Sequence, residues 1–107
     1  MRLSPDPDVF STIATPVRRD IIKRLSVEND QSITILAATY PMSRQAVTRH
    51  IKVLDDTGVI SVRKVGREQI CHFNAQALKE VFDWVKFYER FWDDKLDRLG
   101  EFLASDS

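Results

Sequence analysis

The chain of 107 residues has one cysteine, three glycines and no net charge. These scarcities limit the classes of protein to which it can belong. A single cysteine cannot form an internal disulfide, which fits a reducing compartment. We find no signal peptide and no apolar run near the ~18 residues that a membrane helix needs. We therefore expect a cytoplasmic protein without a membrane partner, and the length suits one domain with a modest core.

The groups that enzymes and metal sites require are also scarce. There is no glycine-rich phosphate loop, and His50 and His72 offer no partnered nucleophile or acid–base pair. Cys71 and His72 are adjacent on a predicted strand, so they point to opposite faces and cannot ligate one ion. Zinc-type sites take three or four such ligands, so we expect no bound metal. Because the chain also lacks a phosphate loop and a partnered nucleophile or acid–base pair, we expect no enzymatic activity and no cofactor. Cys71 is predicted to be a buried strand residue rather than a redox switch.

The net charge of zero conceals an uneven distribution. Residues 43–67 carry six basic and two acidic side chains, a net charge of +4. Residues 74–107 carry five basic and eight acidic side chains, a net charge of −3. A basic middle and an acidic tail suit a nucleic-acid-binding surface that is kept apart from a second surface.

The segment from Met42 to Gly58 has the pattern of a short helix with clear ends. An apolar face recurs at helical spacing through Val47, Ile51 and Leu54. Ser43 is placed to cap the N-terminus, and Gly58 is placed to end the helix in a left-handed conformation. An ordinary amphipathic helix is the alternative for this segment alone. The rest of its surface carries residue types that contact bases and phosphates, namely Arg44, Gln45, Thr48, Arg49 and Lys52.

A cap residue followed by proline occurs twice near the N-terminus. Asp6 and Pro7 predict a short helix that extends to about residue 14, and Thr15 and Pro16 predict a second helix over residues 16–27. The apolar residues expected to point inward from these helices are Phe10, Ile13, Ala14, Ile21, Ile22 and Leu25.

A polar turn over residues 28–31 leads to a third short helix. Residues 32–34 are predicted to be extended, with Thr34 capping a helix that ends near Thr39, because Tyr40 precedes a proline and is disfavoured in a helix. Two helices joined by a few residues, the second with basic outer side chains, predict a helix-turn-helix over residues 34–57.

After Gly58 the pattern becomes that of a β-hairpin. Runs rich in β-branched and aromatic residues, over residues 59–73, flank the two-residue turn signal Gly66-Arg67. A basic hairpin alone is usually only solvated, but directly after this helix it predicts the wing of a winged helix-turn-helix that binds double-stranded DNA. The side chains expected along the phosphates or in the minor groove are Arg63, Lys64 and Arg67.

The remainder predicts one long helix over residues 75–103, capped by Asn74 and about 44 Å long. It contains seven of the ten aromatic residues, more than one small core can cover. We expect one apolar stripe to pack on the chain's own domain and another to contact a second copy across a two-fold axis. Gly100 either ends this helix early or lets two backbones approach. The fold class is thus mainly α, with about five helices and a two-stranded wing.

Three stretches resemble the ArsR-type winged-helix repressors: ATPVRRDII (residues 14–22), MSRQAVTRHIKVL (42–54) and GVI (58–60). The wing sequence GRE (66–68) and the stretch YERFW (88–92) resemble a branch that lacks the usual metal-binding cysteines. This resemblance covers nearly the whole chain. It implies a single-domain, homodimeric prokaryotic repressor that dimerises through residues 1–14 and 75–103 and binds a pseudo-palindromic operator.

The resemblance also implies roles for individual side chains. Arginine pairs with guanine, glutamine with adenine, and the threonine methyl contacts thymine, which assigns base reading to Arg44, Gln45, Thr48 and Arg49. Contacts to the DNA backbone or minor groove are assigned to Ser43, His50, Lys52, Arg63, Lys64 and Arg67. The expected dimer interface consists of Phe10, Ile13, Phe82, Val85, Tyr88, Phe91, Trp92, Leu96 and Leu99.

The chain departs from metal-sensing members of this family. Residues 35–38 are Ile, Leu, Ala and Ala where those members carry a cysteine pair, and the last helix has aspartates but no histidine. Pro41 stands where glycine is frequent. Two alternatives remain: a winged-helix module that binds protein and not DNA, and a repressor released by a small apolar ligand held between the last helices. The sequence identifies no effector.

Overall fold

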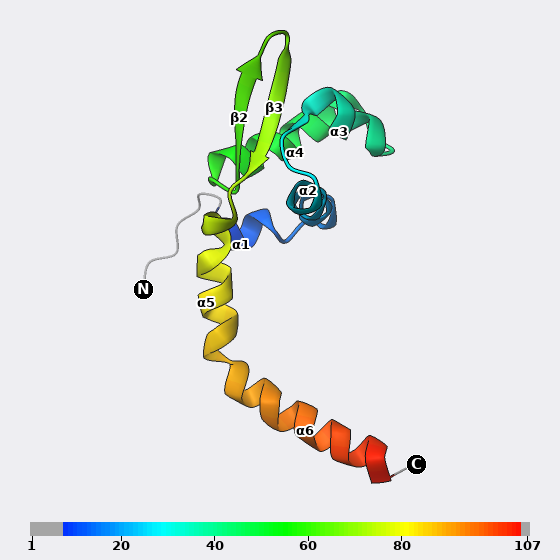
Figure 1. Ribbon diagram of the computed structural model, residues 1–107, viewed down its shortest axis with the longest axis vertical. Helices are drawn as coiled ribbons and strands as arrows, with labels where there is room; N and C mark the ends of the chain where they lie inside the picture. The colour runs from blue at the N-terminus through cyan, green and yellow to red at the C-terminus, as the bar shows by residue number, and fades with distance from the viewer. Residues whose placement is uncertain (1–7, 106–107) are drawn as a thin grey trace.

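Helices and a small antiparallel sheet surround one core, and two further helices lead away from it (Figure 1). The computed structural model describes residues 8–105. The predicted fold class, a winged helix-turn-helix, is confirmed. In chain order the elements are α1 (Val9–Thr12), α2 (Pro16–Val27), β1 (Gln31–Ser32), α3 (Ile33–Thr39), α4 (Arg44–Asp56), β2 (Ile60–Val65), β3 (Glu68–Phe73), the 3-10 helix η1 (Ala75–Leu78), α5 (Lys79–Phe87) and α6 (Glu89–Ser105).

The sheet has the order β1-β3-β2, so the predicted two-stranded wing gains a short third strand at its base. Strands β2 and β3 pair in register from Ile60 with Phe73 to Val65 with Glu68. Their two-residue turn has Gly66 at φ +64°, as a type II′ turn requires at its first central position. Strand β1 pairs antiparallel with β3, which ties the base of the wing to the segment after α2.

The core is apolar and contains residues from every element of the helix-turn-helix and from the sheet. The apolar face of α4 is fully buried, with Val47, Ile51 and Leu54 each at most 2% exposed. Burying three such side chains fixes the rotation of α4 about its axis and leaves its opposite face in solvent. The other side chains at the centre of this core include Ile21, Leu25, Leu36, Val59, Ile60 and Cys71.

Both predicted ends of α4 are confirmed. The Ser43 hydroxyl accepts a hydrogen bond from the Ala46 backbone N–H at 3.1 Å, which satisfies one of the free donors of the first turn. Gly58 follows the helix with φ +78°, a left-handed conformation that glycine adopts without strain.

Two other predicted caps are wrong. Ser32, not Thr34, caps α3 by accepting from the Ile35 N–H at 3.1 Å, because Ser32 is still paired in β1 when the helix begins. At the N-terminus the predicted Asp6 and Pro7 lie outside the described residues, and α1 is capped instead by Asp8. The expected inward-facing Ala14 is exposed, since α1 ends at Thr12.

The single helix predicted for residues 75–103 is wrong in two places. It begins as the 3-10 turn η1, and the Asn74 side chain donates to the Gly58 carbonyl oxygen instead of capping it. It breaks at Tyr88 between α5 and α6. Its end at Ser105 is close to the predicted end, and Gly100 does not end it early. Neither glycine nor proline marks the break, so it has no local sequence signal.

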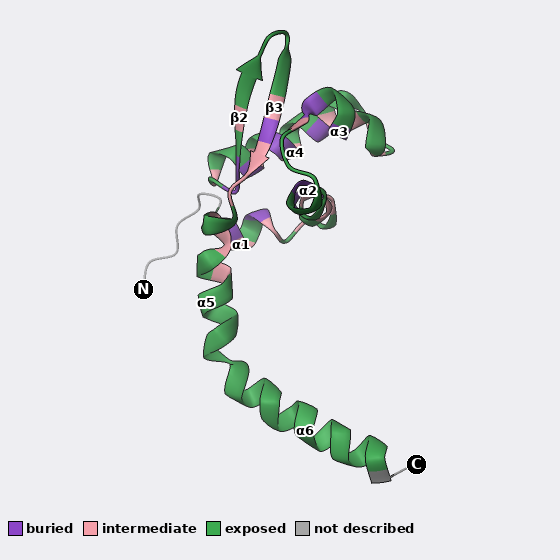
Figure 2. Cartoon of the chain, in the orientation of Figure 1, coloured by how far each residue is buried: buried purple, intermediate pink, exposed green. Residues whose placement is uncertain are grey.

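Helix α6 projects away from the core (Figure 2). The Cα radius of gyration is 18.1 Å, against about 13 Å for a compact domain of this length. Only the start of the C-terminal segment, with Leu78 and Val81, packs on the chain's own core. Beyond Val81, Trp84 still meets Phe10 of α1 edge to face, so the expected apolar stripe on the chain's own domain is confirmed for the start of the segment and is wrong for α6, whose apolar side chains are exposed.

Candidate nucleic-acid interface

The outer face of α4 carries the side chains predicted to read bases. Arg44, Gln45, Thr48 and Arg49 are all exposed, on the side of the helix away from its buried face. None of these four forms an ion pair within the described part of the chain. Their charges and amide groups are therefore free to meet a partner in solvent.

The first turn of α4 and Lys52, further along the helix, complete this surface. After accepting from Ala46, the Ser43 hydroxyl can still donate its own proton. The N-terminal end of the helix also has a partial positive charge that favours an anion. Lys52 lies further along, 3.3 Å from Asp56 in an exposed i,i+4 pair, which is weak enough for a phosphate to compete.

The turn before α4 is fastened to α2 by a tyrosine that the sequence reasoning did not single out. Tyr40 donates its hydroxyl proton to Asp20 at 2.7 Å, and Arg24 donates to the same carboxylate oxygen at 2.9 Å. Burial and the bond to Asp20 raise the pKa of Tyr40 to about 12, so it keeps this proton at neutral pH. The contact holds the start of α4 in place without using any of its outer side chains.

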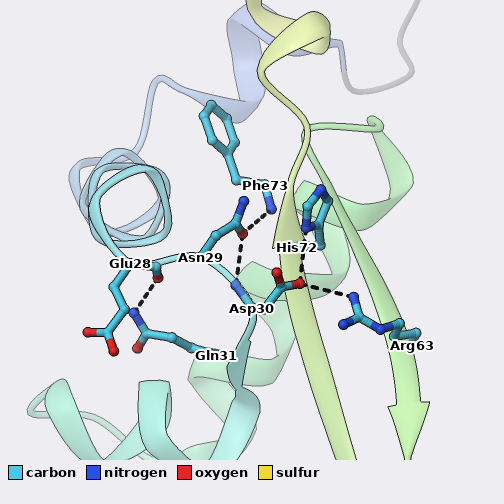
Figure 3. Close-up of polar contacts among 7 residues, drawn as sticks. All are labelled: Glu28, Asn29, Asp30, Gln31, Arg63, His72 and Phe73. Atoms are coloured by element: carbon cyan, nitrogen blue, oxygen red, sulfur yellow. Dashed lines mark hydrogen bonds and ion pairs between the residues drawn. The ribbon is translucent and has the colours of Figure 1, made fainter.

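All three predicted cations of the wing are exposed to solvent, but only two of them are free of an ion pair in the described residues. Lys64 and Arg67 are exposed near the tip. Arg63 is instead paired, because its Nη1 donates to Asp30 Oδ1 at 3.0 Å (Figure 3). His72 Nδ1 lies 3.0 Å from the same oxygen, and the two basic groups hold the pKa of Asp30 below its usual range.

The Asp30 contact belongs to a polar clamp between the turn after α2 and the base of the wing (Figure 3). Asn29 Oδ1 accepts from the Phe73 N–H at 2.8 Å and from the Asp30 N–H at 2.9 Å. Asp30 itself has φ +58°, a left-handed conformation that aspartate tolerates. A polar turn is predicted here, but its contact with the wing spans more than 30 positions and has no local signal.

His50 lies beside α2 rather than on the open face of α4. It is half-buried, and its Nδ1 is 3.3 Å from Nη1 of Arg18. Burial, together with the charges of Arg18 and Arg49, lowers the pKa of His50, which favours the neutral ring. Arg18, Arg49 and His50 line a shallow hollow of about 240 Å³ along with Ala46 and Val53.

Cys71 is buried in the sheet opposite Val62, as the sequence predicts. Burial raises the pKa of its thiol to about 11. Within residues 8–105 no three His, Cys, Asp or Glu side chains come together as a metal ion would require. Over the same residues, no helix is long and apolar enough to cross a bilayer.

Most of the predicted dimer residues lie on a second surface, formed by α5 and α6, whereas Ile13 is partly buried against the chain's own core. The large apolar side chains beyond Val81, on α5, α6 and the break between them, are exposed, from 38% at Tyr88 to 66% at Phe87. Phe10 of α1 reaches this surface and meets Trp84 edge to face at 5.8 Å. A groove of about 560 Å³ runs over the break between the two helices, lined by Trp84, Val85, Tyr88, Phe91, Trp92 and Lys95.

No protein-family model matches the chain. It is 31% identical over 85 residues to the uncharacterized HTH-type transcriptional regulator YuzN of Bacillus subtilis (strain 168), covering 73% of this chain and 92% of that one.

Two solved structures are also similar. The ArsR family transcriptional regulator RHA00566 has a TM-score of 0.70 and 28% identity, with 78% of this chain and 86% of that one covered. A possible transcriptional regulator for arsenical resistance has a TM-score of 0.64 and 32% identity, with 90% and 92% covered. With its winged helix-turn-helix and these relatives, the chain belongs to the ArsR family of transcriptional regulators.

Proposed function

We propose that two copies of this chain bind a pseudo-palindromic DNA operator and repress transcription, with α4 of each copy in a major groove. The observation that carries the proposal is the outer face of α4. It presents Arg44, Gln45, Thr48 and Arg49 to solvent while its opposite face is locked in the core. Because its buried face fixes the orientation of α4, the helix can place these side chains against base edges without reorganising.

The wing supplies sequence-independent contacts. Lys64 and Arg67 extend from the tip toward the phosphates or the minor groove beside α4. Ser43, Lys52 and His50 meet the backbone along the helix itself. Arg63 can join them through the donors that its pair with Asp30 leaves unused, since only its Nη1 contacts that carboxylate.

A second copy of the chain covers the apolar surface of α5 and α6. Exposed aromatic and aliphatic side chains on this scale are costly in water and mark an interface. The predicted contacts are Phe10, Ile13, Phe82, Val85, Tyr88, Phe91, Trp92, Leu96 and Leu99. A two-fold axis through this surface sets the recognition helices about 34–36 Å apart, or a multiple of that distance, to match successive major grooves.

The proposal includes no catalytic reaction and places the protein with DNA in a prokaryotic cytoplasm. We place the chain among the members of the family without the cysteine metal site, because residues 35–38 on α3 are Ile, Leu, Ala and Ala. The rival function is a winged-helix module that binds another protein. The net charge of +4 over residues 43–67 favours DNA.

Selecting bound sequences from random duplexes with the purified full chain tests the proposal. A pseudo-palindrome with one half-site per copy is expected, and affinity should fall steeply with salt because phosphate contacts release counterions. Arg44→Ala or Gln45→Ala should cost about 1–3 kcal/mol and relax specificity at one base pair. Binding that is absent, or independent of salt, would favour the protein-interaction module.

A further inference from the structure

The hollow between α2 and α4 has features of an anion site that neither the helix-turn-helix nor the wing explains. Ala46, His50 and Val53 recur at helical spacing and are half-buried, so they form a row at the edge of α4 between its exposed and buried faces. Arg18 of α2 closes the hollow from the other side. In the described residues no carboxylate pairs with Arg18 or Arg49.

Arg18 is held rigidly yet keeps spare donors. Its Nε donates to the Thr12 carbonyl at 2.7 Å, its Nη2 to the Ser11 carbonyl at 3.2 Å and its Nη1 to His50. A guanidinium has five N–H donors, so these contacts leave about two unused. The carbonyl contacts fix the plane of the group before any ligand arrives, which lowers the entropy that binding would cost.

His50 is oriented by the same contact. Because its Nδ1 accepts from Arg18, the neutral ring carries its proton on Nε2, where it can donate to a ligand. Burial and the charges of Arg18 and Arg49 lower the pKa of His50, which keeps the ring neutral enough to accept at Nδ1. A nearby anion would therefore find a guanidinium and an imidazole N–H together.

We propose that Arg18 and His50 form a seat for one phosphate of the operator backbone, which adds α2 to the DNA-contacting surface. This inference rests on the proposed function. A helix with its side chains is about 10–12 Å across and the major groove is about 12 Å wide, so the edges of a helix in the groove face the two phosphate strands. The seat lies on such an edge, and Arg49 of the base-reading face also lines the hollow.

Salt-dependent duplex binding by Arg18→Gln tests the seat, with Arg19→Gln as the matched control. Arg19 is the adjacent arginine, and it also donates to a backbone carbonyl, that of Ile13 at 2.8 Å, but it does not line the hollow. We expect Arg18→Gln to reduce the slope of log K against log salt by about 0.9 for each copy bound. Affinity should fall equally on cognate and unrelated duplexes, and Arg19→Gln should keep the wild-type slope.

His50→Ala provides a second test that leaves both carbonyl contacts of Arg18 in place. Its affinity should fall about tenfold for each seat on every duplex, the effect of losing one hydrogen bond to a charged group. His50→Gln, which keeps an amide donor, should recover part of this loss. Melting temperatures show whether Arg18→Gln folds, and His50→Ala decides the question if it does not.

The seat is overturned if the wild type binds with a steep salt slope and neither Arg18→Gln nor His50→Ala differs from it. The seat is also overturned if the variants bind most duplexes as the wild type does and lose affinity only where one particular base pair is present. It is overturned, too, if they bind inorganic phosphate more weakly than the wild type but bind duplex DNA equally well. In each of these results the proposed operator binding survives, and only its backbone contact through His50 is lost with the seat. If the wild type bound duplexes without any salt dependence, both the phosphate seat and the proposed DNA-binding function would be refuted.

Discussion

At the scale of single residues, Cys71 has chemistry that can be read directly from its surroundings. Burial raises the pKa of its thiol to about 11, so only about one molecule in a thousand carries the reactive thiolate at pH 8. We expect a disulfide reagent such as DTNB to label the native protein slowly and the guanidinium-unfolded protein at once. Rapid stoichiometric labelling of native protein would show that Cys71 is accessible and would reopen a redox role.

Residue-scale features were predictable from sequence where their cause is local. Ser43 and Gly58 sit at the two ends of one helix, and their roles follow from hydrogen-bonding capacity and backbone freedom alone. Arg63 illustrates the opposite case. Its charge suggested a phosphate contact, but Asp30, far away in the sequence, pairs with it once β1 joins the sheet. Such a partner depends on tertiary structure and leaves no pattern around either residue.

At the scale of elements, the start of α4 combines a structural and a functional role that two substitutions separate. Ser43→Ala removes the cap and should lower the free energy of unfolding by about 1 kcal/mol. Ser43→Asp keeps an equally good cap but places a negative charge where we propose a phosphate lies. Urea unfolding should therefore show Ser43→Asp near wild type, whereas anisotropy should show weaker duplex binding. Unchanged binding by Ser43→Asp would mean that this end of α4 faces no phosphate.

The clamp between the turn after α2 and the wing predicts a pH-dependent difference in stability. Arg63 and His72 lower the pKa of Asp30 in the folded protein. The ionised carboxylate therefore stabilises the fold above the unfolded-state pKa near 3.8, and this stabilisation is lost as the pH falls through the lower pKa of the folded state. Asp30→Asn should melt slightly below wild type at pH 7, and the gap should close in acid. Asp93→Asn, on exposed α6, is the control and should show no gap at either pH.

The C-terminal helices mark the limit of pattern reading at this scale. The heptad-like apolar spacing correctly predicted helix over most of residues 75–103, but not the break at Tyr88. Around the break, Tyr88 meets Trp84 at 5.3 Å and Phe87 at 5.0 Å between ring centroids, both edge to face. The bend thus coincides with a packed aromatic cluster. Periodicity alone cannot show such a cluster, because every residue in it also fits a straight helix.

At the scale of the whole molecule, basic and apolar surfaces are set apart. The outer face of α4 and the wing tip carry the positive charge, and α5 and α6 carry the exposed aromatic residues. α1 links these regions, because Phe10 contacts Trp84 of α5 while the Ser11 and Thr12 carbonyls hold Arg18 next to α4. A second copy that fixes α5 would therefore also steady the proposed phosphate seat.

Dimerisation through α5 and α6 is the last prediction, and two aromatic residues test it. Phe91 and Trp92 both line the groove and are 49% and 61% exposed. Truncating either side chain should therefore reduce the folding stability of the single chain only a little. Phe91→Ala and Trp92→Ala should therefore act mainly on the complex. Sedimentation should show a shift from dimer toward monomer at micromolar concentration, since aromatic residues at interface centres often contribute about 2 kcal/mol or more.

Val27→Ala is the matched control, because Val27 is 84% exposed on α2, outside this surface. It should leave the sedimentation coefficient unchanged. Operator binding should weaken together with dimerisation, since a monomer holds one half-site and loses the gain from tethering the second. An unchanged dimer in both aromatic variants would exclude this surface, and the two recognition helices would then need another two-fold axis to reach successive grooves.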